Sequence, residues 1–116
     1  MGQQVMQVHG LPDQPLDAVD VFHDRVAPAL LDALAQLDPD GDLVIVFEPA
    51  GPEHRAWRLA AVQDFARAAA PNWRCNAVTG DDQRLLAPLL AYLAAAPGVT
   101  GQMLVVDGAL PPQALG

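Results

Sequence analysis

The sequence contains no serine and no lysine in 116 residues. Hydrolases of the Ser-His-Asp type need a serine nucleophile, so their chemistry is excluded. Schiff-base catalysis and the phosphate-binding loop both depend on a lysine, and they are excluded as well. Aromatic residues make up only 5% of the chain, and arginine supplies all six of the strongly basic side chains.

Positive charge is also scarce, because fourteen acidic residues outweigh the six arginines and give a net charge of -8. A nucleic acid or an anionic membrane attracts the opposite balance, so neither is expected as a partner. The single cysteine, Cys75, excludes an internal disulfide and favours the cytoplasm. No apolar run approaches the roughly 18 residues of a membrane span, and the N-terminus lacks the pattern of a signal peptide.

What the sequence does contain is a regular alternation of short apolar runs and longer helical patterns. Strands are predicted at residues 5–8, 43–47, 73–78 and 103–106, and helices at 16–37, at 53–70 and from 81 or 82 to 96. Asp17 is the expected cap of the first helix, and Pro28 predicts a kink or a late start within it. Prolines and glycines separate the elements.

This alternation predicts parallel strands with helices on both faces of the sheet. We therefore expect an α/β fold, a three-layer sandwich in which a partial Rossmann-like parallel sheet of about four strands carries three helices. The predicted domain covers residues 1–108. Residues 109–116 contain two prolines and are expected to form a flexible or partner-held tail.

Three motifs carry a family resemblance. The most distinctive is the run at residues 100–108, Thr-Gly-Gln-Met-Leu-Val-Val-Asp-Gly, and the others are Cys-Asn-Ala-Val at 75–78 and Leu-Ala-Ala-Val at 59–62. Together they resemble the second half of the short-chain dehydrogenase/reductase family, over residues 5–108. The resemblance implies a truncated, C-terminal half of a Rossmann fold.

The same resemblance locates what is missing. The family's catalytic lysine position holds Leu59, its tyrosine position holds Arg55, and its serine position falls near Phe47 or Glu48. Neither a leucine nor a permanently protonated guanidinium can support proton transfer beside a hydride. The glycine-rich turn that holds a dinucleotide is absent too. We therefore expect no catalytic residues and no bound cofactor.

The resemblance also implies two surfaces for subunit association, because the family's subunits meet through the helices retained here. The helix at 53–70 has apolar residues nearly all round, which predicts cover on more than one side or a broad core face. The expected partner is a second copy, a full-length short-chain dehydrogenase/reductase, or both. The predicted contact residues are Leu30, Leu34, Trp57, Leu59, Val62, Phe65 and Ala69.

The alternative hypothesis is a small-ligand-binding protein or an enzyme that uses the loop after the second strand. Glu48, His54, Arg55 and Thr79 are its candidate residues, since ligand sites of α/β folds form at the carboxyl ends of parallel strands. The same acids can instead favour the positive start of the next helix. The histidines lack paired metal-ligand spacing, so no metal is expected, and Cys75 is interpreted as an inert core thiol.

Overall fold

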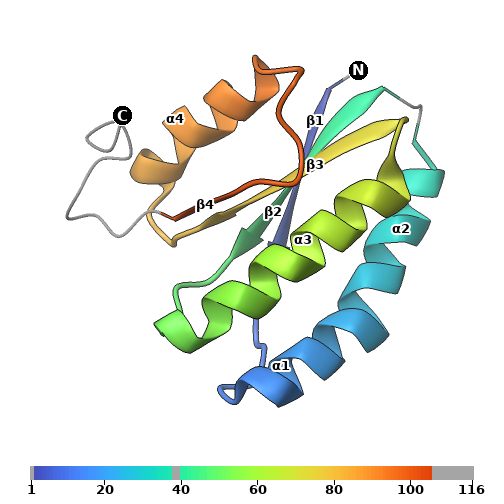
Figure 1. Ribbon diagram of the computed structural model, residues 1–116. Helices are drawn as coiled ribbons and strands as arrows, with labels where there is room; N and C mark the ends of the chain where they lie inside the picture. Colours follow the sequence, from blue (N-terminus) through green and yellow to red (C-terminus); the bar gives the residue numbers. More distant parts are fainter. Residues whose placement is uncertain (1, 38–39, 106–116) are drawn as a thin grey trace.

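A computed structural model describes residues 2–37 and 40–105 as a single twisted sheet between two helical layers (Figure 1). The predicted tail at 109–116 and the last residue of the fourth predicted strand, Val106, lie outside these described residues. Each predicted helix and strand is present. Most boundaries fall within one or two residues of the expected positions.

The sheet contains β1 (Gln3–Val8), β2 (Gly41–Phe47), β3 (Trp73–Thr79) and β4 (Met103–Val105). These strands lie in sequence order, and every neighbouring pair is parallel. All seven residues of β2 are buried. A strand that is apolar without alternation is covered on both faces, and β2 meets this expectation.

The first predicted helix is divided into α1 (Pro15–Val21), a π-helical turn η1 (Phe22–Val26) and α2 (Ala27–Ala35). The widened turn comes just before Pro28, which has no N–H to continue the α-helical ladder. The amide of Ala27 bonds the carbonyl of Phe22, five residues earlier. The expected cap was wrong, because Gln14 is the N-cap residue and Asp17 lies in the first turn.

The second predicted helix begins as a short 3-10 turn, η2 (Pro52–His54), and continues as α3 (Arg55–Ala69). The third is α4 (Gln83–Ala94), and Asp82 caps it, since its carboxylate accepts the amide of Arg84 at 3.0 Å. Arg74 closes the other end of α4 by donating to the carbonyls of Leu93 and Ala96. Both ends of α4 are thus held by side chains.

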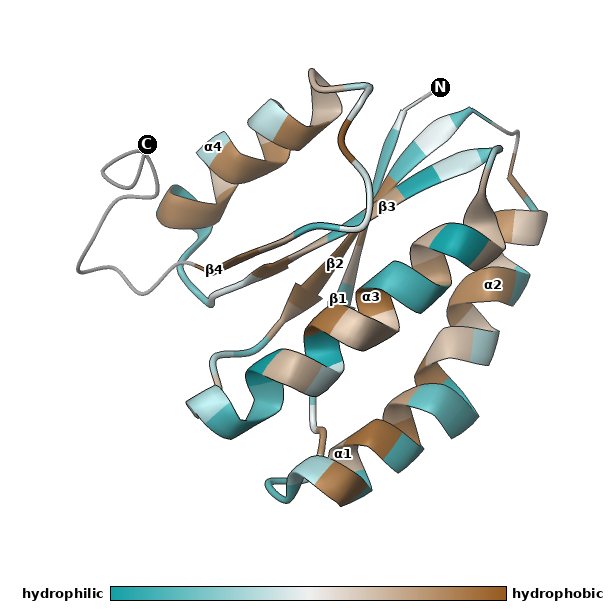
Figure 2. Cartoon of the chain, in the orientation of Figure 1, coloured by the Kyte–Doolittle hydropathy of each residue, from teal (hydrophilic) through white to brown (hydrophobic). Residues whose placement is uncertain are grey.

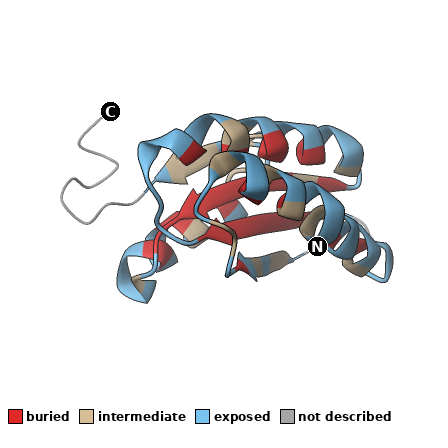
Figure 3. Ribbon diagram, turned by 90° about the horizontal axis from the view of Figure 1, so that it is seen from below, coloured by how far each residue is buried: buried red, intermediate tan, exposed pale blue. Residues whose placement is uncertain are grey.

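The strands divide their side chains between two cores. Leu43, Ile45 and Phe47 of β2 pack on the layer formed by α1, α2 and α3. Val44 and Val46 pack on α4, on the opposite face of the sheet. This alternation produces three layers with the buried strands in the middle (Figures 2 and 3). The expected α/β sandwich with four parallel strands and three helices is confirmed.

Candidate functional site

A pocket of about 260 Å³ opens at the carboxyl ends of β1 and β2. The loops that follow these two strands form its walls, together with the start of α3. Its lining residues are Val8, Leu11, Pro12, Asp13, Glu48, Pro49, Ala50, Gly51, Glu53, His54 and Arg58. The pocket therefore lies at the edge of the sheet where open α/β folds bind their ligands.

His54 is buried in the wall of this pocket and is held at both ring nitrogens. The indole N–H of Trp57 donates to Nδ1 at 2.9 Å, so this nitrogen carries no proton. Nε2 must then carry the proton, and it donates to the carbonyl of Asp13 at 2.8 Å. A histidine with both nitrogens engaged in this way is a structural group and has no free position for proton transfer.

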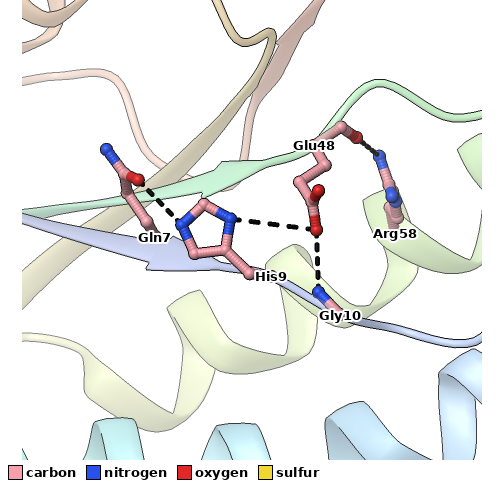
Figure 4. Close-up of polar contacts among 5 residues, drawn as sticks. All are labelled: Gln7, His9, Gly10, Glu48 and Arg58. Atoms are coloured by element: carbon pink, nitrogen blue, oxygen red, sulfur yellow. Dashed lines mark hydrogen bonds and ion pairs between the residues drawn. The ribbon is translucent and has the colours of Figure 1, made fainter.

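Glu48 follows β2 and turns its carboxylate toward the end of β1, as Figure 4 shows. Its Oε1 accepts the amide of Gly10 at 2.8 Å and lies 3.8 Å from Nδ1 of His9. The other ring nitrogen of His9 lies 2.9 Å from the side-chain oxygen of Gln7. Glu48 is therefore linked to His9 and Gly10, and no hydrogen bond between Glu48 and His54 is found among the described residues.

The other two candidate loop residues lie elsewhere. Arg55 is exposed at the first turn of α3, and Thr79 is buried at the end of β3. Neither residue lines the 260 Å³ pocket. Of the four predicted loop residues, the pocket thus brings together only Glu48 and His54.

Arg58 also lines this pocket, although the sequence favoured interpreting it as one of several dispersed surface arginines over a carboxylate or phosphate contact. Its side chain is only 6% exposed, and its guanidinium carbon lies 4.5 Å from the centre of the Phe47 ring. Nη1 donates to the backbone carbonyl of Glu48 at 2.9 Å (Figure 4). Burial lowers the pKa of Arg58, and the charge of Glu48 partly opposes this effect.

A signal for this burial was present in the sequence. Arg58 stands three, four and seven residues before Ala61, Val62 and Phe65, which places all four on one side of α3. That side faces the sheet. An arginine within the apolar stripe of a helix is thus a stronger indication of a site than arginines scattered over a surface.

The predicted contact residues fall into two groups. Leu30, Leu34, Val62 and Phe65 are buried in the core between the helices and the sheet. Trp57, Leu59 and Ala69 are only partly buried. The first group has almost no surface to offer a partner, because its members already pack within the chain.

The outer side of α3 is less apolar than its sequence suggested. Ala56 and Ala60 are exposed near its start, and Gln63 follows them. Further along, Asp64 and Arg67 form an ion pair on the surface. The large apolar residues of α3 therefore face inward or sideways, as the interpretation of a broad core face predicted.

Residues 100–102, which carry the family motif, lie in the loop that joins α4 to β4, and this loop packs against β3. Asn76 is fully buried in β3, and it donates to the carbonyl of Val99 and accepts the amide of Gln102, both at 3.0 Å. Gly101 has a φ of 74° and donates its amide to the carbonyl of Cys75 at 2.7 Å. A positive φ favours glycine at this position.

Cys75 is fully buried beside this loop, and the structure supports its interpretation as an inert thiol. Burial raises the pKa of Cys75 to about 12, and the charge of Asp42 adds to the shift. The native thiol is therefore almost entirely protonated at neutral pH. Because reaction with a thiol reagent requires the thiolate, Cys75 should react slowly in the folded chain.

We expect iodoacetamide at pH 8 to label Cys75 only when the chain unfolds. The labelling rate in native buffer should fall at least 100-fold below the rate in 6 M guanidinium chloride, as followed by intact mass. A short thiol-containing peptide in the same tube controls for the reagent. Equal rates in the two buffers would show that β3 is accessible in the folded chain.

Two further findings concern the described residues as a whole. Within residues 2–37 and 40–105, no three histidine, cysteine, aspartate or glutamate side chains gather into a set that could hold a metal ion. In the same part of the chain, none of the helices combines the length and the apolar character that crossing a membrane requires.

Comparison with known families agrees with this fold. A family model described as short chain dehydrogenase-like protein matches residues 6–106. The match covers most of the chain, from within β1 to the end of β4. The comparison with curated proteins finds no match. The chain belongs to the short-chain dehydrogenase-like family.

Proposed function

We propose that this chain is a non-catalytic member of the short-chain dehydrogenase-like family that acts by association. Its partner is a second copy of itself or a full-length short-chain dehydrogenase/reductase. A cytoplasmic location belongs to the same proposal. The observation that carries the association is the edge of the sheet at β1, beyond which no further strand lies in the part of the chain that the structure describes.

The non-catalytic part of the proposal rests on the start of α3. The resemblance assigns the catalytic tyrosine and lysine to the positions of Arg55 and Leu59, which are exposed and half-buried respectively. The one tyrosine of the chain, Tyr92, lies on α4 and is 56% exposed. With neither the tyrosine nor the lysine at these positions, the family's usual proton donor is missing.

The association rests on β1, which among residues 2–37 and 40–105 pairs only with β2 and forms one edge of the sheet. Val5 lies in register with Val44, so both residues point to the α4 side of the sheet. Val44 is completely buried there, whereas Val5 remains 39% exposed. Parallel sheets are normally covered on both faces, and edges with free backbone groups attract another strand.

Val5→Lys is expected to convert an assembled protein into a monomer, because a charge on an edge strand prevents strand pairing. Light scattering after size exclusion should give at least twice the 12.3 kDa of one chain for the wild type. It should give about 12.3 kDa for the variant. Circular dichroism should show both proteins folded.

Leu16→Lys is the matched control, because Leu16 is 81% exposed on α1 and does not belong to the sheet. This variant should keep the wild-type mass. A wild-type mass of one chain, together with no complex with a purified short-chain reductase, would refute the association. If the Val5→Lys variant kept the assembled mass, the contact between chains would not lie at β1.

A second candidate function is the binding of a small ligand, and the pocket at the ends of β1 and β2 favours it. Acid/base catalysis by Glu48 and His54 is not part of this candidate, because the two side chains point to different partners. Of the residues of β1, only Val8 lines the pocket, and Val5 does not. A chain that associates through β1 can therefore also bind a ligand.

A further inference from the structure

Arg58 is a buried cation without a carboxylate partner. Among the described residues, no aspartate or glutamate oxygen lies within 4.0 Å of its guanidinium. Nη1 makes one hydrogen bond, to a backbone carbonyl, and Nε is enclosed with no acceptor. A guanidinium has five N–H donors, and buried arginines are normally paired with an anion.

The aromatic neighbours of Arg58 do not replace that anion. The Phe47 ring covers one face of the guanidinium, and the Trp57 ring lies 5.9 Å from its carbon. Contacts of this kind stabilise the cation over its flat face, whereas the N–H groups point outward in the plane and still require acceptors. Because Arg58 lines the pocket, a bound carboxylate can accept from the terminal N–H groups on that side, whereas Nε stays enclosed.

The remaining charges of the pocket are negative. Asp13, Glu48 and Glu53 line it, and all three are exposed. The Glu53 carboxylate lies over Gly51, so a larger side chain there would require the carboxylate to move. A single buried cation thus stands within a ring of three acids, an arrangement that repels dianions and attracts an ammonium group.

We propose that this pocket binds a small zwitterion, with its carboxylate on Arg58 and its amino group among Asp13, Glu48 and Glu53. The volume of about 260 Å³ suits such a molecule, since pockets for drug-sized ligands span about 300–1,000 Å³. This inference rests on the ligand-binding candidate and not on association at β1. The expected ligands are therefore small amino acids.

The test compares γ-aminobutyrate with butyrate and butylamine, which each carry only one of its two charges. Each compound is titrated into isotope-labelled protein and followed by the amide resonances of Ala50 and Gly51. We expect saturable shifts with γ-aminobutyrate at a dissociation constant on the order of 1 mM, in keeping with so few atoms. Butyrate and butylamine should each bind at least tenfold more weakly.

Arg58→Gln should weaken γ-aminobutyrate binding at least tenfold, and Arg55→Gln, which changes an arginine outside the pocket, should leave it unchanged. Because Arg58 is buried, its variant can lose the fold. Ala50→Trp tests the same site from an exposed loop position, since the indole would fill the pocket. It should abolish binding without lowering the melting temperature.

Three results would overturn the inference. They are the absence of saturable binding, equal binding of a singly charged compound, and binding that survives Ala50→Trp. Light scattering on the same samples reports the assembled mass separately. A failure of ligand binding with an intact assembly therefore leaves the association unaffected, and the reverse also holds.

Discussion

Phe65→Arg is expected to leave the chain largely unfolded at 25 °C. Phe65 is 4% exposed on the sheet side of α3, in the core that includes Val62 and Trp73. Removing a buried phenylalanine side chain costs about 3–5 kcal/mol, and an unpaired charge in its place adds to this loss. Since the whole stability of a domain is about 5–15 kcal/mol, little folded protein should remain.

Urea denaturation followed by circular dichroism measures this effect, and Ala60→Arg provides the control on the same helix. Ala60 is exposed on the outer side of α3, so its substitution should change the free energy of unfolding by less than about 0.5 kcal/mol. If the two variants unfolded at the same urea concentration, Phe65 would not be a core residue. If Phe65→Arg gave a folded monomer, Phe65 would instead belong to the contact surface that the sequence predicted.

Asn76→Ala is expected to lower the free energy of unfolding by about 2–3 kcal/mol. The fully buried amide makes two hydrogen bonds to the loop before β4, and both partners lose them in the variant. An unpaired buried polar group costs about 1–3 kcal/mol, and the lost side-chain volume adds a smaller penalty. Denaturation by urea, monitored by tryptophan fluorescence, measures the change.

The only other asparagine supplies the control. Asn72 is exposed just before β3, and its backbone carbonyl accepts the amides of Asp40 and Gly41. Asn72→Ala keeps those backbone bonds and should shift stability by less than about 0.5 kcal/mol. Equal destabilisation by the two substitutions would indicate that Asn76 does not hold the loop that carries the family motif.

The position of the strands followed from the sequence because their apolar pattern is local. The continuous apolar run at 43–47 is typical of a strand that is covered on both faces, and all residues of β2 are buried in this way. The π-helical turn before Pro28 shows the limit of such reasoning. A missing N–H predicts a disturbance of the helix, but packing of both helical halves on one sheet decides that the chain widens and continues.

The pocket was only partly predictable for a related reason. That loops meet at the carboxyl ends of parallel strands is a property of the topology, so Glu48 and His54 could be expected near each other. The directions of their side chains depend on His9 and Asp13, both in the loop after β1, and on Trp57, three residues beyond His54. Only the contact between His54 and Trp57 is local in the sequence.

The sequence by itself determined the fold class and the absence of serine and lysine, because both depend on residue type and on spacing along the chain. Only the tertiary structure decided which apolar residues are core and which are surface. It also decided that Arg58 is a buried cation in a pocket. Burial and charge pairing are set by segments far apart in sequence, and they exist only after the sheet has brought those segments together.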